Sequence, residues 1–126
     1  MTVILDAGAL LAVERGDRDM VAVLKRERLE DRAPLTHGGV IGQVWRGGSG
    51  RQAGLARLLP GVDVRPLDDE MGRRAGMLLG AARGGDVIDA AIVVLSDDGD
   101  EIFTSDTGDL GELARAAGRH VELIAI

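Results

Sequence analysis

The chain has 126 residues, 45% of them hydrophobic, and carries a net charge of -6. A chain of this length can bury one modest core, so a single domain spanning residues 1–126 is expected. The absence of cysteine excludes disulfides, thiolate metal sites and cysteine nucleophiles. The acidic charge argues against a protein that coats nucleic acid nonspecifically, because such domains usually carry a basic excess.

The sequence contains no apolar run near the roughly 20 residues that a membrane span needs. Its first 13 residues also lack the basic region that precedes the apolar part of a signal peptide. Together with the missing cysteines, these features predict a soluble protein of the cytoplasm with no membrane partner.

Short strand-like runs alternate with longer helix-like segments, which is the pattern of a parallel sheet flanked by helices. The strands are expected at residues 3–5, 33–36, 62–67, 101–104 and 121–124. The helices are expected at residues 17–30, 40–46, 52–59, 68–83, 87–95 and 110–117. The helix at 87–95 is apolar nearly all round, as a buried helix is. The predicted fold class is therefore α/β with a mainly parallel central sheet.

Three aspartates stand at the ends of these elements. Asp6 follows the first strand, Asp106 follows the fourth, and Asp89 lies at the head of the apolar helix. Open α/β sheets bind their ligands at the carboxyl ends of the strands, where such side chains can meet. Carboxylate oxygens are the ligands that Mg²⁺ prefers. The pattern therefore predicts metal-dependent chemistry.

Each aspartate also has a purely structural interpretation. An aspartate just after a strand is often only the N-cap of the next helix, and this alternative stays open for Asp6, Asp106 and Asp109. Asp89 is harder to explain in this way, because a carboxylate in an apolar helix is costly to bury unless it is paired or binds a metal.

Several short motifs together carry a family resemblance. They are Ile4-Leu5-Asp6 before a small-residue turn, Asp86 to Ile92, Val44 to Gly48, and Thr104-Ser105-Asp106 followed by Asp109-Leu110. In this order and spacing the chain resembles, over nearly its whole length, the PIN-domain nucleases. It is most similar to the VapC-like toxins of bacterial toxin-antitoxin pairs.

The resemblance implies a three-layer α/β/α sandwich and an endoribonuclease that hydrolyses RNA phosphodiester bonds with Mg²⁺ or Mn²⁺. It assigns Asp6, Asp89 and Asp106 as the residues that hold one or two ions. Asp86 and Asp109 are then candidates to orient metal-bound water, although Asp86 is equally read as a loop acid or an N-cap. Thr104 and Ser105 are candidates to hydrogen-bond a phosphate, or are ordinary polar residues at a strand end. The family also implies a small antitoxin as partner and a homodimer.

One family position differs in this chain. Gln43 stands where the family has an acid, and no Asp or Glu occurs between Arg32 and Val62 to replace it. A glutamine can offer a carbonyl oxygen to a metal or its water, but it carries no charge and cannot act as a base. Two hypotheses follow: an active nuclease, or a PIN-like protein that binds RNA or a partner with weak or no catalysis.

Two arginines are candidates for holding RNA. An acidic metal site repels the phosphate backbone, so nearby cations are needed to bind it. Arg46 and Arg51 flank the glycine-rich segment that follows the helix of Gln43. The alternative is that both are solvated surface residues.

Overall fold

The fold is built on one sheet of five parallel strands in the order β3-β2-β1-β4-β5. The structure is a computed structural model that describes residues 1–126. Its strands are β1 (Val3–Leu5), β2 (Leu35–His37), β3 (Asp63–Arg65), β4 (Glu101–Thr104) and β5 (Glu122–Ala125). The predicted parallel sheet is confirmed, and all of its strand pairs are parallel.

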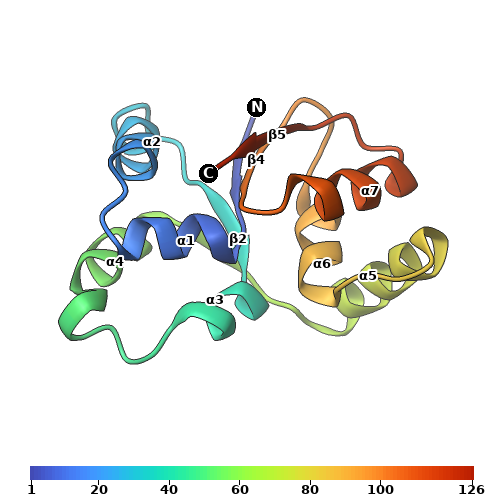
Figure 1. Cartoon of the computed structure of the whole chain (residues 1–126), viewed down its shortest axis with the longest axis horizontal. Coiled ribbons are helices and arrows are strands. Elements are labelled where there is room, and N and C mark those ends of the chain that lie inside the picture. Colours follow the sequence, from blue (N-terminus) through green and yellow to red (C-terminus); the bar gives the residue numbers. More distant parts are fainter.

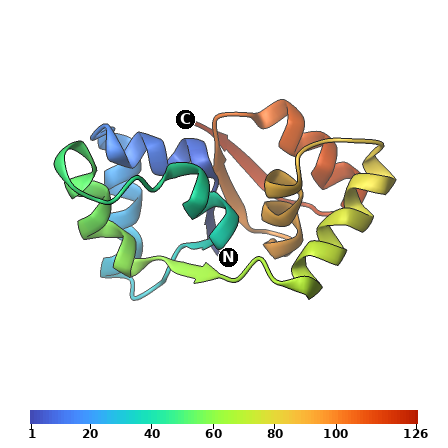
Figure 2. The same ribbon diagram turned by 90° about the horizontal axis from the view of Figure 1, so that it is seen from below.

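Seven α-helices cover the two faces of the sheet. They are α1 (Ala7–Glu14), α2 (Arg18–Leu29), α3 (Gly38–Val44), α4 (Ala53–Leu58), α5 (Asp69–Ala82), α6 (Val87–Leu95) and α7 (Thr107–Ala117), with 3-10 turns η1 (Gly50–Gln52) and η2 (Leu59–Gly61). Figure 1 and the turned view in Figure 2 show α1 to α4 on one side of the sheet and α5 to α7 on the other. The three-layer α/β/α arrangement predicted from the sequence is confirmed.

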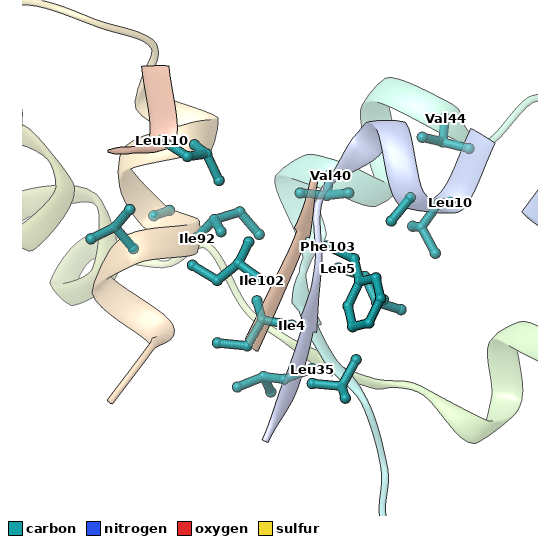
Figure 3. Close-up of a cluster of buried hydrophobic side chains, with 14 of the residues drawn as sticks. Ile4, Leu5, Leu10, Leu35, Val40, Val44, Ile92, Ile102, Phe103 and Leu110 are labelled. Carbon is teal, nitrogen blue, oxygen red and sulfur yellow. The ribbon is translucent and has the colours of Figure 1, made fainter. Parts of the chain in front are cut away.

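The core consists of the apolar strands and the helix faces that cover them. Ile4 of β1 and Ile102 of β4 are fully buried, as are Leu10 of α1 and Ile92 of α6. Figure 3 shows these side chains gathered around the two central strands. Burying each such side chain stabilises the fold by roughly 1.5–3 kcal/mol. The central strand β1, Val3-Ile4-Leu5, is a continuous apolar run, as a strand covered on both faces is.

The sequence interpretation was wrong about the segment after Asp6. A small-residue turn was expected there, whereas α1 begins directly at Ala7. Ala9, Leu10, Ala12 and Val13 are all buried, so this helix shows no alternation of apolar and polar residues by which it could be recognised. None of the helices combines the length and the apolar character that a membrane crossing requires.

The topology brings several chain segments to one edge of the sheet. Because all five strands are parallel, their carboxyl ends share that edge, and α1 and α3 start there directly after β1 and β2. The start of α7 follows β4 after Ser105 and Asp106. Polar residues at these three helix starts are therefore neighbours in space although they are far apart in the sequence.

Candidate metal centre

Asp6 lies at the junction of β1 and α1 and has two separate roles available to it. It is only 6% exposed, and its Oδ1 accepts a hydrogen bond from the Ala9 amide at 2.9 Å, which caps α1. Its Oδ2 makes no hydrogen bond, and no buried polar side-chain atom in the structure lacks a partner. That oxygen therefore remains open to solvent while the cap holds the carboxylate in place.

Asp106 occupies the same position after the neighbouring strand. Leu5 of β1 and Phe103 of β4 are paired, and the Asp6 amide donates to the Phe103 carbonyl at 3.3 Å. The Oδ1 of Asp106 accepts from the Asp109 amide at 3.0 Å and so caps α7. Asp6 and Asp106 are thus brought to adjacent strand ends, as predicted. In each of these two carboxylates, one oxygen caps a helix and the other makes no hydrogen bond.

Asp89 lies in the first turn of α6, and its side chain makes no hydrogen bond or ion pair within the chain. Asp86 is the N-cap of this helix: its Oδ1 accepts from the amides of Ile88 at 2.7 Å and Asp89 at 3.1 Å. The N-cap alternative for Asp86 is therefore confirmed. The carboxylate of Asp89 is positioned only by the backbone that carries it.

The electrostatics show that these carboxylates gather around Asp89. Burial, and after it the negative charges of Asp86, Asp6, Asp106 and Asp109, together raise the pKa of Asp89 from 3.8 to about 6. Such an effect weakens with distance, so it requires these acids to be close. No neighbouring cation acts in the opposite direction. The edge of the sheet is therefore a region of uncompensated negative charge.

A cleft of about 240 Å³ opens beside this group, between the loop before α6 and the first turns of α7. Its lining includes Asp86, Asp89 and Asp109, together with Glu112 and Arg83. The hydrogen bond to Asp106 and its charge raise the pKa of Asp109 as well. The cleft therefore joins the acids of α6 to those of α7 on one accessible surface.

The donor atoms suit a hard divalent cation that keeps part of its water. No group of three or more acidic or histidine side chains is arranged closely enough to hold an ion by itself. Mg²⁺, however, is usually bound through one or two carboxylates and several water molecules. The carboxylates of Asp6, Asp89 and Asp106 offer oxygen donors of this kind, one or two at a time.

Gln43 lies on the last turn of α3, and its side chain is exposed and makes no hydrogen bond. Helices rise 1.5 Å per residue, so it stands roughly 8 Å along the axis from the start of α3 at the sheet edge. It therefore faces solvent, and its neutral amide adds no charge to the acidic group.

The structure does not bring the predicted arginines to the acids. The Nη1 of Arg46 donates to the carbonyls of Gly42 at 3.2 Å and Trp45 at 2.7 Å, which folds the side chain back onto the end of α3. Arg51 is exposed in η1. Figure 1 shows the connection from α3 to α4 on the side of the molecule away from α6 and α7. Arg83, which follows α5 and lines the acidic cleft, is the arginine that lies next to the site.

The structure separates the two polar residues at the end of β4. Thr104 is fully buried, and its Oγ1 accepts from the Asp106 amide at 2.8 Å. The prediction that Thr104 binds a phosphate is therefore wrong, because the side chain cannot be reached and instead orients Asp106. Ser105 is exposed and lies against Gly8 of α1, where a Cβ would collide with its side chain. It remains available beside Asp6.

Two buried residues at the end of β2 were missed by the sequence interpretation. The Oγ1 of Thr36 donates to the Leu5 carbonyl at 2.7 Å, and the Nε2 of His37 lies 2.9 Å from the Ile88 carbonyl. Each thus contacts the residue just before one of the candidate ligands, Asp6 or Asp89. The available signal was a polar pair that ends a short strand before two glycines.

Comparison with known proteins adds one result. No family model matches the sequence, and no curated protein matches it. Among solved structures, the chain is similar to a chain in the crystal structure of VapBC2 from Rickettsia felis bound to a DNA fragment from their promoter. The two are 12% identical with a TM-score of 0.69, and the match covers 98% of each chain. The likeness shows that the two chains share one fold over nearly their whole length, which agrees with the predicted PIN-like fold.

Proposed function

We propose that this protein is a metal-dependent endoribonuclease that acts as the toxin of a toxin-antitoxin pair. The observation that carries the proposal is the group of carboxylates around Asp89, at the carboxyl edge of a sheet with the VapC-type fold. Their mutual repulsion is relieved by a cation, and the oxygen donors suit Mg²⁺ or Mn²⁺.

In this reaction the protein's side chains would hold the metal ion and orient its water. Asp6 and Asp106 are fixed by their caps on α1 and α7, which leaves one oxygen of each free of the cap bond. Asp89 completes the set from α6. A divalent ion bound there lowers the pKa of a water and neutralises charge on a phosphodiester. Asp86 and Asp109 line the adjoining cleft, so we expect them to orient water around the ion.

RNA needs positive charge beside this acidic region. Arg83 lines the cleft and Ser105 is exposed next to α1, so these residues are our candidates for contacting the phosphate backbone at the site. Arg46 and Arg51 lie beyond α3, so we expect them to contact RNA nucleotides only at a distance from the cleavage site.

The antitoxin and the homodimer are part of the same proposal. The similar structure contains VapBC2 bound to a promoter fragment. For this chain we infer a small partner protein with a basic side chain that enters the acidic cleft. Opposite charge makes such a contact favourable and competes with the divalent ion. The homodimer is tested by sedimentation of the purified protein.

A second function is favoured by Gln43. A glutamine in place of an acid supplies neither charge nor base, so the chain can keep the fold and bind RNA or a partner with weak or no cleavage. Because the Gln43 side chain is exposed and unbonded, Gln43→Glu introduces the missing charge without removing any contact. This variant therefore separates the two functions.

The experiment is a titration of Mn²⁺ and Mg²⁺ into the pure protein by calorimetry, with cleavage of a mixed RNA pool measured in parallel. Wild type is compared with Asp89→Asn, Gln43→Glu and Asp19→Asn, the last being a charge-matched control on the exposed first turn of α2. If the protein is a nuclease, metal binding and RNA cleavage should be lost in Asp89→Asn and unchanged in Asp19→Asn. Activity that arises only in Gln43→Glu supports the binding protein. Absence of metal binding and of cleavage in all variants contradicts the nuclease.

A further inference from the structure

We propose that His37 is a positioning residue: its imidazole ties the start of α3 to the first turn of α6 and thereby fixes where Asp89 stands. The inference rests on the proposed function in that Asp89 is taken as a metal ligand. His37 is fully buried at the carboxyl end of β2, and it belongs to none of the motifs that predicted the site.

The hydrogen bonds of His37 define its state. The Gly39 amide donates to Nδ1 at 3.1 Å, so Nδ1 carries no proton. The Nε2 nitrogen, 2.9 Å from the Ile88 carbonyl, must then be the donor. Burial lowers the pKa of His37, in agreement with a neutral ring. One imidazole thus caps α3 with one nitrogen and holds α6 with the other.

The backbone of α6 is the only restraint on the Asp89 side chain. Its carboxylate has no partner within the chain, so the first turn of α6 decides where it stands. Asp86 holds this turn through the amides of Ile88 and Asp89, and His37 holds it through the Ile88 carbonyl. A carbonyl has two lone pairs, so this bond does not compete with the helix's own hydrogen bonding. The turn is thereby held from both sides.

Packing around Gly39 shows how closely the two helix starts approach. A Cβ at Gly39 would lie 2.5 Å from Ile88 Cδ1 and 2.9 Å from His37 Cε1. Figure 2 shows the start of α3 beside α6 at the end of β2. The neighbouring residue Thr36 makes the matching contact to the Leu5 carbonyl, just before Asp6. The last two residues of β2 therefore brace the segments that carry two of the three acids.

Two substitutions test the hydrogen bonds of Nδ1 and Nε2 separately. In His37→Gln the side-chain amide can reach the place of Nε2 and donate to Ile88, while the cap on α3 is lost. In His37→Asn the oxygen can replace Nδ1 as the cap, but the side chain is too short to reach Ile88. The proposal predicts that His37→Asn weakens Mn²⁺ binding on the order of tenfold, as loss of an outer contact to a ligand does. His37→Gln should bind within about threefold of wild type, even if it is less stable.

A readout independent of metal is hydrogen exchange at the Asp89 amide. It should accelerate roughly fivefold to tenfold in His37→Asn, the factor expected for one lost hydrogen bond, and change little in His37→Gln. Asp17→Ala, which removes the cap of the distant helix α2, is the control for general loss of stability. Equal effects in the two His37 variants, in proportion to their stability, would overturn the proposal.

Nitrogen-15 NMR of wild type tests the inference without any substitution. The ring of His37 should be neutral and protonated at Nε2 at pH 7. A ring protonated at Nδ1, or at both nitrogens, contradicts the proposed tie. If wild type binds no Mn²⁺, the proposed function fails, whereas the exchange and NMR results still decide whether His37 positions Asp89.

Discussion

Asp86 accepts a hydrogen bond from the backbone amide of Asp89 at 3.1 Å, while its charge raises the pKa of the Asp89 carboxyl. The same residue therefore stabilises the helix start and disfavours the ionised form of its neighbour. Natural proteins retain an arrangement of this kind where the repulsion serves a function, such as attracting a cation. The two effects can be measured separately.

The first prediction concerns Asp89→Asn and pH. The folded pKa of Asp89, about 6, lies above its ordinary value of 3.8, so between these pH values the folded state binds more protons than the unfolded state. Stability is therefore lost as pH rises through this window, and the whole penalty is present above pH 6. After allowance for the solvent exposure of Asp89, the penalty is about 1 kcal/mol. Asp89→Asn should be more stable than wild type by that amount at pH 7.5 with a chelator present.

Urea unfolding at pH 7.5 and at pH 4 measures the effect. The gain from Asp89→Asn should nearly vanish at pH 4, because the wild-type carboxyl is by then largely protonated in the folded state. Asp19→Asn, on the exposed start of α2, should show no comparable dependence. A gain of equal size at both pH values would mean that the substitution acts by packing, which contradicts the electrostatic explanation.

The second prediction separates the two effects of Asp86. Asparagine caps helices about as well as aspartate but carries no charge. Asp86→Asn should therefore keep the start of α6 intact and lower the pKa of Asp89, because one of the charges that raise it is removed. Asp86→Ala should lower that pKa too and also cost about 1 kcal/mol of stability through loss of the cap. Carbon-13 NMR of the Asp89 carboxyl and thermal unfolding are the measurements. An unchanged pKa in Asp86→Asn contradicts the proximity of the two carboxylates.

Local sequence signals were sufficient to predict the bounds of an element where residues within or next to it mark its first and last positions. The helix at Val87–Leu95 and the strand at Glu101–Thr104 have the bounds predicted from the sequence. The helix α7 begins three residues earlier than the expected residue 110, at Thr107, because Asp106 caps it. Asp6 and Asp106 could be predicted as a pair, since strand ends of a parallel sheet share an edge, whereas Asp89 was predicted from its place in an apolar helix.

The other features of the site depend on contacts between residues far apart in the chain, which no local sequence pattern predicts. His37 and Ile88 are 51 residues apart, and only the fold shows that they meet. Arg46 is close to Gln43 in the sequence, but the length of α3 carries it away from the acids and its guanidinium caps the helix end. Arg83 enters the cleft because α5 ends there in a left-handed residue with φ 61°. None of these facts follows from composition or periodicity.

The third prediction concerns the buried acid of α2. Glu27 is 2% exposed, and its carboxylate is held by Arg32 at 2.6 Å and Arg26 at 3.0 Å. The hydrogen bond from Arg32 lowers the pKa of Glu27, so the stabilisation is present above pH 4.5 and is lost as pH falls. Arg32→Met should lower the melting temperature at pH 7 by about 5 °C.

The matched variant is the double substitution Glu27→Leu with Arg32→Met. Replacing both partners removes the buried charge that Arg32→Met leaves with Arg26 as its one remaining partner, so it should recover most of the lost melting temperature. Scanning calorimetry at pH 7 compares the single and double variants. A double variant less stable than Arg32→Met alone would show that the ion pair itself, and not the penalty of leaving Glu27 with Arg26 alone, stabilises α2.

The fourth prediction concerns Gln52, which holds the loop between α3 and η1. Its Oε1 accepts from the amides of Arg46 at 2.9 Å and Gly48 at 3.1 Å, and its Nε2 donates to Glu14 at 2.6 Å and to the Val44 carbonyl at 2.9 Å. Gln52→Leu leaves these partners unsatisfied and should cost about 3 kcal/mol. Trypsin should also cleave more readily after Arg46, because Gln52 no longer holds the Arg46 and Gly48 amides. Gln43→Leu is the matched control, because it makes the same chemical change at an exposed glutamine without hydrogen bonds. Urea unfolding and limited trypsin digestion followed by mass spectrometry measure both effects. Equal cleavage at Arg46 in the two variants would show that Gln52 does not hold the loop.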